Sequence, residues 1–325
     1  MIDQALAGEL RASHPTVACV GTFIVDVLGR PVSELPRGQV SALLEEIRMT
    51  AAGTAGGTAV DLARLGAKVI AVGAVGHDNI GDFLLSTLEA QGVDSSHLVR
   101  KEGVQTSATI LPIHPDGSRP AWHVPGANPA LCLDDIPWDV LTACDAVHLG
   151  GLTALPGLDG APAGQILAHA REHGALTTAD FLGVRGAAPA LQLAECLPHV
   201  DIFMPNEGEA LAIWNDADLP VAARRLRDLG AHCVIIKRGS EGCLVLDDDG
   251  ERSLPAHDAP VVDTTGCGDA FCAAVIAARC AGWSVDAAAE LGCAAGALNM
   301  RGLGSDAGAR DVEEALAFAA GVPYR

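Results

Sequence analysis

The sequence predicts an α/β fold: one three-layer α/β/α domain with a mostly parallel central sheet and a small β lid. Short apolar runs alternate with longer stretches of helical spacing along most of the chain. Strands that alternate with helices are joined by parallel crossovers, which place helices on both faces of a sheet. Hydrophobic residues make up 49% of the 325 residues, which is enough apolar surface to cover two such faces.

The predicted strands are short runs rich in Val, Ile, Leu and Ala. They cover residues 17–23, 69–75, 146–149, 176–179, 202–204, 233–237 and 244–246. The predicted helices have apolar residues three or four positions apart. They cover residues 58–65, 80–91, 163–173, 207–214, 221–229, 269–281, 285–299 and 312–319. Sheets of this kind bind ligands beyond the carboxyl ends of their strands, so functional residues are expected there.

Two segments interrupt this alternation. Residues 28–52 contain Pro31 and Pro36 among mixed polar and apolar residues, and residues 104–125 resemble two short strands joined by a His-Pro-Asp-Gly turn. Together they predict a small β element beside the main sheet, suited to cover a site as a lid. An ordinary surface hairpin is the alternative. Residues 1–325 are otherwise predicted to form one domain.

Composition limits the partners. The net charge is −20 and the sequence pI is about 4.7, which disfavours nucleic acid and anionic membranes as partners. ATP is compatible with this charge, because a local site can override the mean field. No apolar stretch is long enough to span a bilayer, and residues 1–15 lack the apolar core of a signal peptide. The ten cysteines include no Cys-x-x-Cys pair, so we expect core thiols of a cytoplasmic protein.

The most informative segment is residues 263–269, which read Asp-Thr-Thr-Gly-Cys-Gly-Asp before a long apolar helix. Gly266 and Gly268 permit a tight turn. The backbone N–H groups of this turn, including that of Cys267, would converge at the positive end of the helix dipole as an anion hole. Asp269 lies beside the same point and is the predicted general base. Phosphoryl transfer from a nucleotide to an alcohol is the chemistry this indicates. A helix start with an acidic first turn is the simpler alternative.

A second motif, Asn206-Glu-Gly-Glu209, follows a predicted strand and opens a helix. Asn206 and Glu209 share a helix face and are predicted to organise Mg²⁺ through its waters near the phosphates. A plain capping box, with Asn at the N-cap and Glu three residues later, is the alternative.

A third motif, Lys237-Arg-Gly239-Ser-Glu-Gly242, follows the strand at 233–237. Lys237, Gly239 and Gly242 are predicted to contact ATP, because glycine lets the backbone approach phosphates or ribose closely. The same residues also read as a hairpin turn, and the two interpretations are compatible.

Near the start of the chain, Asp26 follows the first predicted strand, and Gly56 and Gly57 precede the first long helix. A carboxylate and a glycine pair suit a polyhydroxylated ligand, which needs bidentate acceptors and close backbone contact. These residues are therefore candidates for a sugar-binding site. A solvated loop acid is the alternative interpretation of Asp26.

Five motifs occur in one order: Gly56-Gly57 before a helix, Gly76-x-Asp78-x-x-Gly81, Gly126-Ala127-Asn128, Asn206-x-x-Glu209 and residues 263–269. This set resembles the ribokinase-like (PfkB) family of carbohydrate kinases, over residues 17–305. The resemblance implies ATP-dependent phosphorylation of a sugar hydroxyl by a homodimer that pairs through its lids. It also implies that Asp263 and Thr265 belong to a loop that binds a monovalent cation such as K⁺.

The chain departs from the family at several places, among them Cys267, where Ala is common and the backbone N–H is unaffected. Asp61 stands where many members carry Asn, so it is assigned to the substrate pocket with altered hydroxyl contacts. The segment His148-Leu-Gly-Gly151 lacks the Glu that ribokinases use on ribose. The resemblance therefore predicts a sugar kinase without predicting ribose.

Three other functions remain open from the sequence. A nucleoside kinase would need an aromatic stacking partner, for which Trp122 is the candidate. A phosphosugar kinase would need a cation at the distal phosphate, from a set comprising Arg30, Arg37, Arg119 and Arg185. A non-catalytic regulator that binds sugar or nucleotide is the alternative of a different class, and the intact Asp269 disfavours it.

Overall fold

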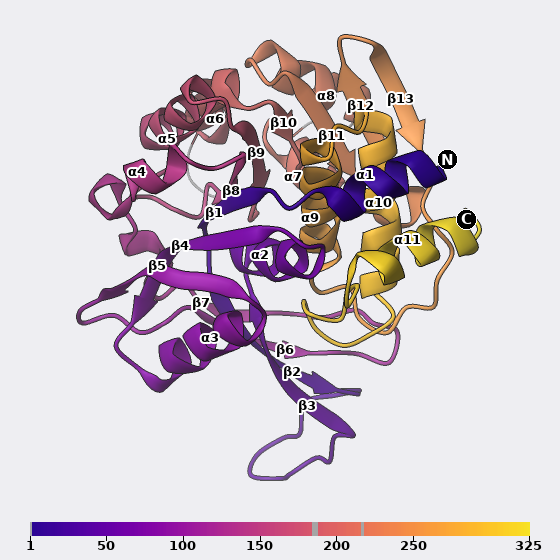
Figure 1. The fold of residues 1–325 in the computed structure, drawn as a ribbon. Helices are drawn as coiled ribbons and strands as arrows, with labels where there is room; N and C mark the ends of the chain where they lie inside the picture. Colours follow the sequence, from indigo (N-terminus) through magenta and orange to yellow (C-terminus); the bar gives the residue numbers. More distant parts are fainter. Residues whose placement is uncertain (1, 184–187, 216–217) are drawn as a thin grey trace.

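The computed structural model describes residues 2–183, 188–215 and 218–325. In this part of the chain a nine-stranded sheet forms the centre of the molecule (Figure 1). Its strands, in spatial order, are β13 (Gly250–Leu254), β12 (Cys243–Asp247), β11 (Cys233–Lys237), β10 (Ile202–Phe203), β9 (Leu176–Phe181), β8 (Ala146–Leu152), β1 (Thr16–Gly21), β4 (Lys68–Gly76) and β5 (Val93–Lys101). Pairing is parallel from β11 to β5, and β12 and β13 add an antiparallel edge.

Helices cover both faces of this sheet, each over its own apolar core. One face carries α1 (Gln4–Ala12), α2 (Thr54–Arg64), α3 (Asn79–Ala90), α9 (Cys267–Cys280), α10 (Val285–Asn299) and α11 (Val312–Gly321). The other carries α4 (Trp138–Leu141), α5 (Ala161–Glu172), α6 (Pro189–Cys196), α7 (Glu207–Ala212) and α8 (Leu219–Asp228). The predicted three-layer architecture is confirmed.

Helix α9 is the central helix of its layer. Every residue from Ala270 to Ala278 is buried, because α9 packs against α2 and α10 as well as the sheet. This explains why the segment reads as uniformly apolar rather than amphipathic. Any shift of α9 would disturb its packing against α2, α10 and the central sheet. This packing fixes the position of the turn that precedes α9.

A second, four-stranded sheet projects from the body of the molecule (Figure 1). It consists of β3 (Glu46–Ala52), β2 (Ile24–Arg30), β6 (Ala108–Pro112) and β7 (Trp122–Val124). A small core of Leu28, Leu111, Ile113 and Leu303 attaches it to the body. This sheet is the predicted β element, although β2 begins at Ile24, before the predicted lid segment.

Most predicted elements lie within a few residues of the observed ones, and the bounds of β11 and α10 are confirmed. Helix α2 begins at Thr54, four residues before the predicted start. The prediction missed α1, α4, α6, β5 and β13. Strands β5 and β13 are the two edges of the sheet, and their partly exposed, polar sequences lack a continuous apolar run. All ten cysteines are free, and no described helix is long and apolar enough to cross a membrane.

Candidate active site

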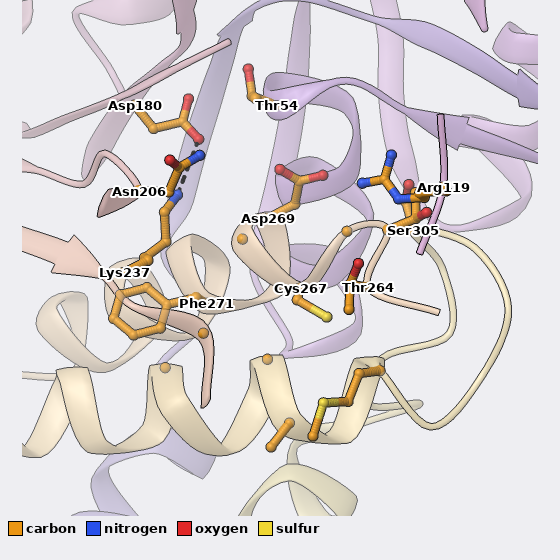
Figure 2. A pocket seen from close by; sticks show the side chains of 18 of the residues that line it. Thr54, Arg119, Asp180, Asn206, Lys237, Thr264, Cys267, Asp269, Phe271 and Ser305 are labelled. Carbon is orange, nitrogen blue, oxygen red and sulfur yellow. Dashed lines mark ion pairs between the residues drawn. The ribbon is translucent and has the colours of Figure 1, made fainter. Parts of the chain in front are cut away.

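A cavity of about 740 Å³ opens at the carboxyl ends of the central strands, between the lid sheet and the start of α9. The lid contributes Asp26, Thr109, Arg119 and His123, and the main sheet contributes Asp180, Asn206 and Lys237. The turn from Thr264 to Asp269 forms another part of the wall. Figure 2 shows Asp269 between Arg119 on one side and Asp180 and Lys237 on the other. The cavity therefore lies where the parallel sheet predicts a ligand site.

The glycine turn before α9 has the geometry of an anion hole. Gly266 adopts a left-handed conformation at φ 78°, and a Cβ there would lie 2.4 Å from the Cα of Ser305. Within the described residues, the N–H groups of Gly266, Gly268 and Asp269 have no acceptor, while that of Cys267 has a long contact of 3.5 Å to the carbonyl of Thr264. Free N–H groups at a helix start bind anions, so the turn is equipped to hold a phosphoryl group.

Asp269 is held against α2 beside these N–H groups. A Cβ built on Gly57 would lie 2.4 Å from Asp269 Oδ2 and 3.0 Å from its Cβ, so the absence of a side chain at Gly57 makes room for the carboxylate. Burial, reinforced by the charge of Asp180, raises the pKa of Asp269 well above 3.8. Such a pKa suits a group that must accept a proton near neutral pH.

A buried ion pair that the sequence prediction missed lies next to Asp269. Lys237 Nζ is 3.7 Å from Asp180 Oδ2, and both side chains are almost fully buried. Burial raises the pKa of Asp180 to about 6, against the charge of Lys237. Burial alone would lower the pKa of Lys237, but the Cys272 thiol and then Asp180 raise it. The ammonium also lies 3.3 Å from where a Cβ of Gly268 would stand, so a permanent cation adjoins the anion hole.

Asp180 has a recognisable signal in the sequence. It directly follows the predicted strand at 176–179, as Asp26 follows the first predicted strand. Its Oδ1 accepts the N–H of Gly151 at 3.2 Å, which fixes the carboxylate at the end of β9. A strand-end acid in a parallel sheet is therefore a candidate site residue wherever it occurs.

Asn206 and Glu209 form the capping box that was the alternative interpretation. Asn206 Oδ1 accepts the N–H of Glu209, and Glu209 Oε2 accepts the N–H of Asn206, both at 2.9 Å. Glu209 Oε1 accepts the N–H of Gly183 at 3.1 Å. Both residues also line the cavity. Each carboxylate oxygen retains a second lone pair, so this donor set fits a water-bound Mg²⁺ rather than direct coordination.

The segment from Gly239 to Gly242 is a hairpin turn between β11 and β12 that also lines the cavity. Gly242 has φ 77°, and a Cβ there would lie 1.9 Å from the carbonyl oxygen of Leu254. Glycine is therefore required by close backbone packing. The two interpretations of this motif are both compatible with the structure.

The predicted sugar-contacting residues separate in the structure. Asp26 lies in β2, buried at the cavity wall, and burial raises its pKa to about 6. Gly56 and Gly57 do not belong to the cavity wall, because α2 starts earlier than predicted and the pair lies inside its first turns. The α2 residues that do reach the cavity are Gly53, at the N-cap with φ 88°, and Thr54. Gly56 and Gly57 therefore stay a prediction for the substrate site, and the structure adds Gly53 and Thr54 from the start of the same helix.

Asp61, which was assigned to the substrate pocket, is fully buried away from the cavity wall. Neither of its carboxylate oxygens has a hydrogen-bond partner, and the same holds for Asn299 Oδ1. Both side chains approach Gly308, whose missing Cβ would lie 3.0 and 3.3 Å from their oxygens. Burial raises the pKa of Asp61 to about 8, so a protonated carboxyl is the favoured form in this position at neutral pH.

This raised pKa makes stability fall as pH rises. The unfolded carboxyl titrates near 3.8 and the folded one near 8, so the folded state holds the extra proton between these values and loses that stabilisation through pH 8. Asp61→Asn is expected to flatten this dependence and to raise the unfolding free energy at pH 8.5 by about 1–3 kcal/mol. Urea unfolding at pH 5 and 8.5 measures both effects. Loss of sugar binding in this variant would return Asp61 to the substrate pocket.

Asp263 and Thr265, the predicted cation ligands, form a closed hydrogen-bonded loop. Asp263 accepts bonds from the N–H and Oγ1 of Thr265 at 3.0 and 2.7 Å and from the N–H of Gly304 at 2.9 Å. Asn299 Nδ2 donates to the carbonyl of Thr265 at 2.6 Å. The side-chain oxygens are therefore engaged in holding the turn that precedes the anion hole.

The fold and the cavity together define a class of enzyme: a kinase that transfers a phosphoryl group to an alcohol. A family model described as pfkB family carbohydrate kinase matches residues 14–311. The chain belongs to this family of carbohydrate kinases.

Its relatives agree with this assignment. An uncharacterized sugar kinase from Archaeoglobus fulgidus is 30% identical over 71% of this chain and 90% of that protein. An ATP-dependent ribose-1-phosphate kinase from Halopiger xanaduensis is 31% identical over 89% of this chain and 92% of that protein. Among solved structures, Arabidopsis thaliana ribokinase complexed with ribose and ATP superimposes with a TM-score of 0.78 at 22% identity, covering 94% of this chain and 99% of that one.

Proposed function

We propose that this carbohydrate kinase transfers the γ-phosphoryl group of ATP to a hydroxyl group of a sugar or sugar derivative, with Asp269 as general base. The observation that carries this proposal is the juxtaposition of the Asp269 carboxylate, three N–H groups without acceptors and the Lys237 ammonium at one end of the cavity. A base and an anion site at one point are what in-line transfer to an alcohol requires.

In this mechanism the sugar hydroxyl lies between Asp269 and the γ-phosphorus. The hydroxyl oxygen forms a bond to phosphorus while the bond to the bridging β,γ-oxygen breaks, and ADP leaves. The hydroxyl proton passes to Asp269. The N–H groups of Gly266 and Gly268, with Lys237, hold the charge on the transferred group. The lid sheet excludes water, which would otherwise accept the phosphoryl group.

The nucleotide is proposed to extend from the anion hole toward Gly239 and Gly242. Asn206 and Glu209 would hold Mg²⁺ through its waters, and the ion would neutralise charge on the phosphates.

A monovalent cation such as K⁺ remains a proposal for the Asp263–Thr265 loop. Because the Asp263 side chain already accepts hydrogen bonds, the cation would be bound by backbone carbonyl oxygens of this loop. Use of ATP makes the cytoplasm the proposed compartment.

The acceptor is proposed to lie between Asp26 and Asp269. The nucleoside alternative loses its stacking candidate, because Trp122 is 49% exposed and does not line the cavity. A phosphosugar kinase would need a cation for the distal phosphate. Of the four candidate arginines, Arg30 and Arg37 do not line the cavity, Arg119 does, and Arg185 lies outside the described residues. A relative acts, by its name, on ribose 1-phosphate, so neutral and anionic acceptors both belong in the test.

The test is ADP release with MgATP and K⁺ across a panel of neutral sugars, sugar acids, sugar phosphates and nucleosides. We expect one sugar class to give turnover far above the ATPase background. Turnover with nucleosides alone would replace the sugar assignment. ATP binding without turnover on any acceptor would favour the non-catalytic regulator.

The proposed assembly is a homodimer paired through the lid sheets. Strand register puts Met49, Val27, Ile110 and Trp122 in one row across the four lid strands. Three of these side chains are 44–56% exposed, an apolar surface of the kind that marks an interface. We expect a dimer in sedimentation analysis at micromolar concentration and a monomer after Ile110→Glu. A wild-type monomer would contradict this assembly.

A further inference from the structure

Arg119 extends from the loop between β6 and β7 into the sugar end of the cavity. The loop is anchored there, because a Cβ on Gly117 would lie 3.0 Å from Val261 Cγ1. Figure 2 shows the Arg119 guanidinium beside Ser305 and turned toward Asp269. The side chain is 30% exposed, so it is partly enclosed and still open to a ligand.

The guanidinium has an incomplete set of partners in the described structure. Arg119 Nε is buried without a hydrogen-bond partner. The nearest carboxylate oxygen, Asp263 Oδ1, is 3.7 Å away and already accepts two bonds from Thr265. Asp263 therefore balances part of the charge of Arg119 without satisfying its donors. Leaving a buried donor of a charged group unsatisfied is costly, which indicates a missing acceptor.

Within the residues that the structure describes, Arg119 is also the cation of this end of the cavity whose ion pair, with Asp263, is long at 3.7 Å. Among the other cationic residues of the described wall, Lys237 pairs with Asp180, and Arg325 lies beside Ala256 next to the predicted nucleotide loop. Asp26 also lines this cavity and is within reach of the charge of Arg119, and its pKa is raised to about 6 because burial outweighs its hydrogen bond from Thr109 and that charge. A ligand placed between Asp26 and Asp269 meets this guanidinium.

We propose that Arg119 binds an anionic group of the acceptor, a carboxylate or a phosphate, so that the substrate is an anionic sugar derivative rather than a neutral sugar. The inference rests on the proposed function and specifies its substrate class. A planar guanidinium fork matches the paired oxygens of either group. The acceptor hydroxyl then faces Asp269, and the charged group is held at a fixed distance from it by the lid loop.

The experiment compares matched acceptors that differ in charge: ribose, ribonate and ribose 1-phosphate, and the corresponding glucose set. We expect anionic members to have the higher kcat/KM. Arg119→Gln should lower kcat/KM for them by about 10- to 10³-fold, chiefly through KM, with little change for neutral sugars. Arg119→Lys should recover part of the loss. Comparison of the carboxylate acceptors with the phosphate acceptors identifies which anionic group Arg119 binds. Arg30→Gln, a lid arginine outside the cavity wall, is the matched control and should behave as wild type.

Preference for a neutral sugar, or equal losses on neutral and anionic acceptors in Arg119→Gln, would overturn the inference and leave the kinase proposal intact. The kinase proposal fails separately if no acceptor gives ADP release. In that case thermal-shift titration with ribonate and ribose 1-phosphate still decides the inference. Protection that disappears in Arg119→Gln supports it, and protection that persists, or none in the wild type, contradicts it.

Discussion

Asp269→Asn is expected to lower kcat by about 10²- to 10⁴-fold while nucleotide binding stays near that of the wild type. The amide keeps the size of the side chain but cannot accept the hydroxyl proton. The carboxylate also lies in a site that destabilises its ionised form, so its replacement should raise the melting temperature at neutral pH. A variant that is more stable, binds ATP and is nearly inactive is the combined result expected of a base.

The pH dependence provides a second measurement on the same residue. A general base must be ionised, and the pKa of Asp269 is raised by burial and by Asp180. Activity is therefore expected to fall on the acid side at a pH well above 3.8, through the pKa of Asp269 in the free enzyme. The residual activity of Asp269→Asn should lack this acidic limb. Near-normal turnover in the variant, or an unchanged limb, would assign the proton transfer to another group.

The fold was predictable because its signals are local. A buried parallel strand must be apolar along its length, so runs such as that of β11 identify themselves. Edge strands carry no such signal, because one side faces solvent and polar residues replace the run. Helix α9 is uniformly apolar for the same reason as the buried strands, because it packs against other elements on every side.

The site was predictable where one continuous segment builds it. The anion hole and Asp269 occupy consecutive positions, so their geometry follows from a glycine turn at a helix start. Asp180 follows a predicted strand and Arg119 was a candidate cation, but they reach the cavity from β9 and from the lid loop, and no spacing in the sequence places either beside Asp269. Asp61 shows the opposite case. Its place in a motif predicted a substrate contact, whereas the structure buries both of its carboxylate oxygens without hydrogen-bond partners, away from the cavity wall.

Gly57→Ala is expected to lower kcat by about 10²-fold without unfolding the protein. The new methyl group would lie 2.4 Å from Asp269 Oδ2, 2.9 Å from its Cγ and 3.0 Å from its Cβ. Rotation of the carboxylate alone cannot relieve three such contacts, so α2 and the start of α9 must separate slightly. A displacement of this order at a reacting group typically costs about two orders of magnitude in rate. Steady-state kinetics with saturating MgATP measures it.

Gly56→Ala is the matched control one residue away on the same helix. Its methyl group would lie 3.2 Å from Phe23 Cδ1, and its three nearest atoms all belong to Phe23 rather than to Asp269. Both substitutions gain about the same helix propensity, roughly 1 kcal/mol, so folding effects of that kind cancel in the comparison. Near-normal kcat in Gly56→Ala together with a large loss in Gly57→Ala would mean that the absence of a side chain at Gly57 leaves the space that the Asp269 carboxylate occupies. Equal rates in the two variants would show that the position of Asp269 tolerates displacement, and that binding contributes more to the rate than the alignment of the base.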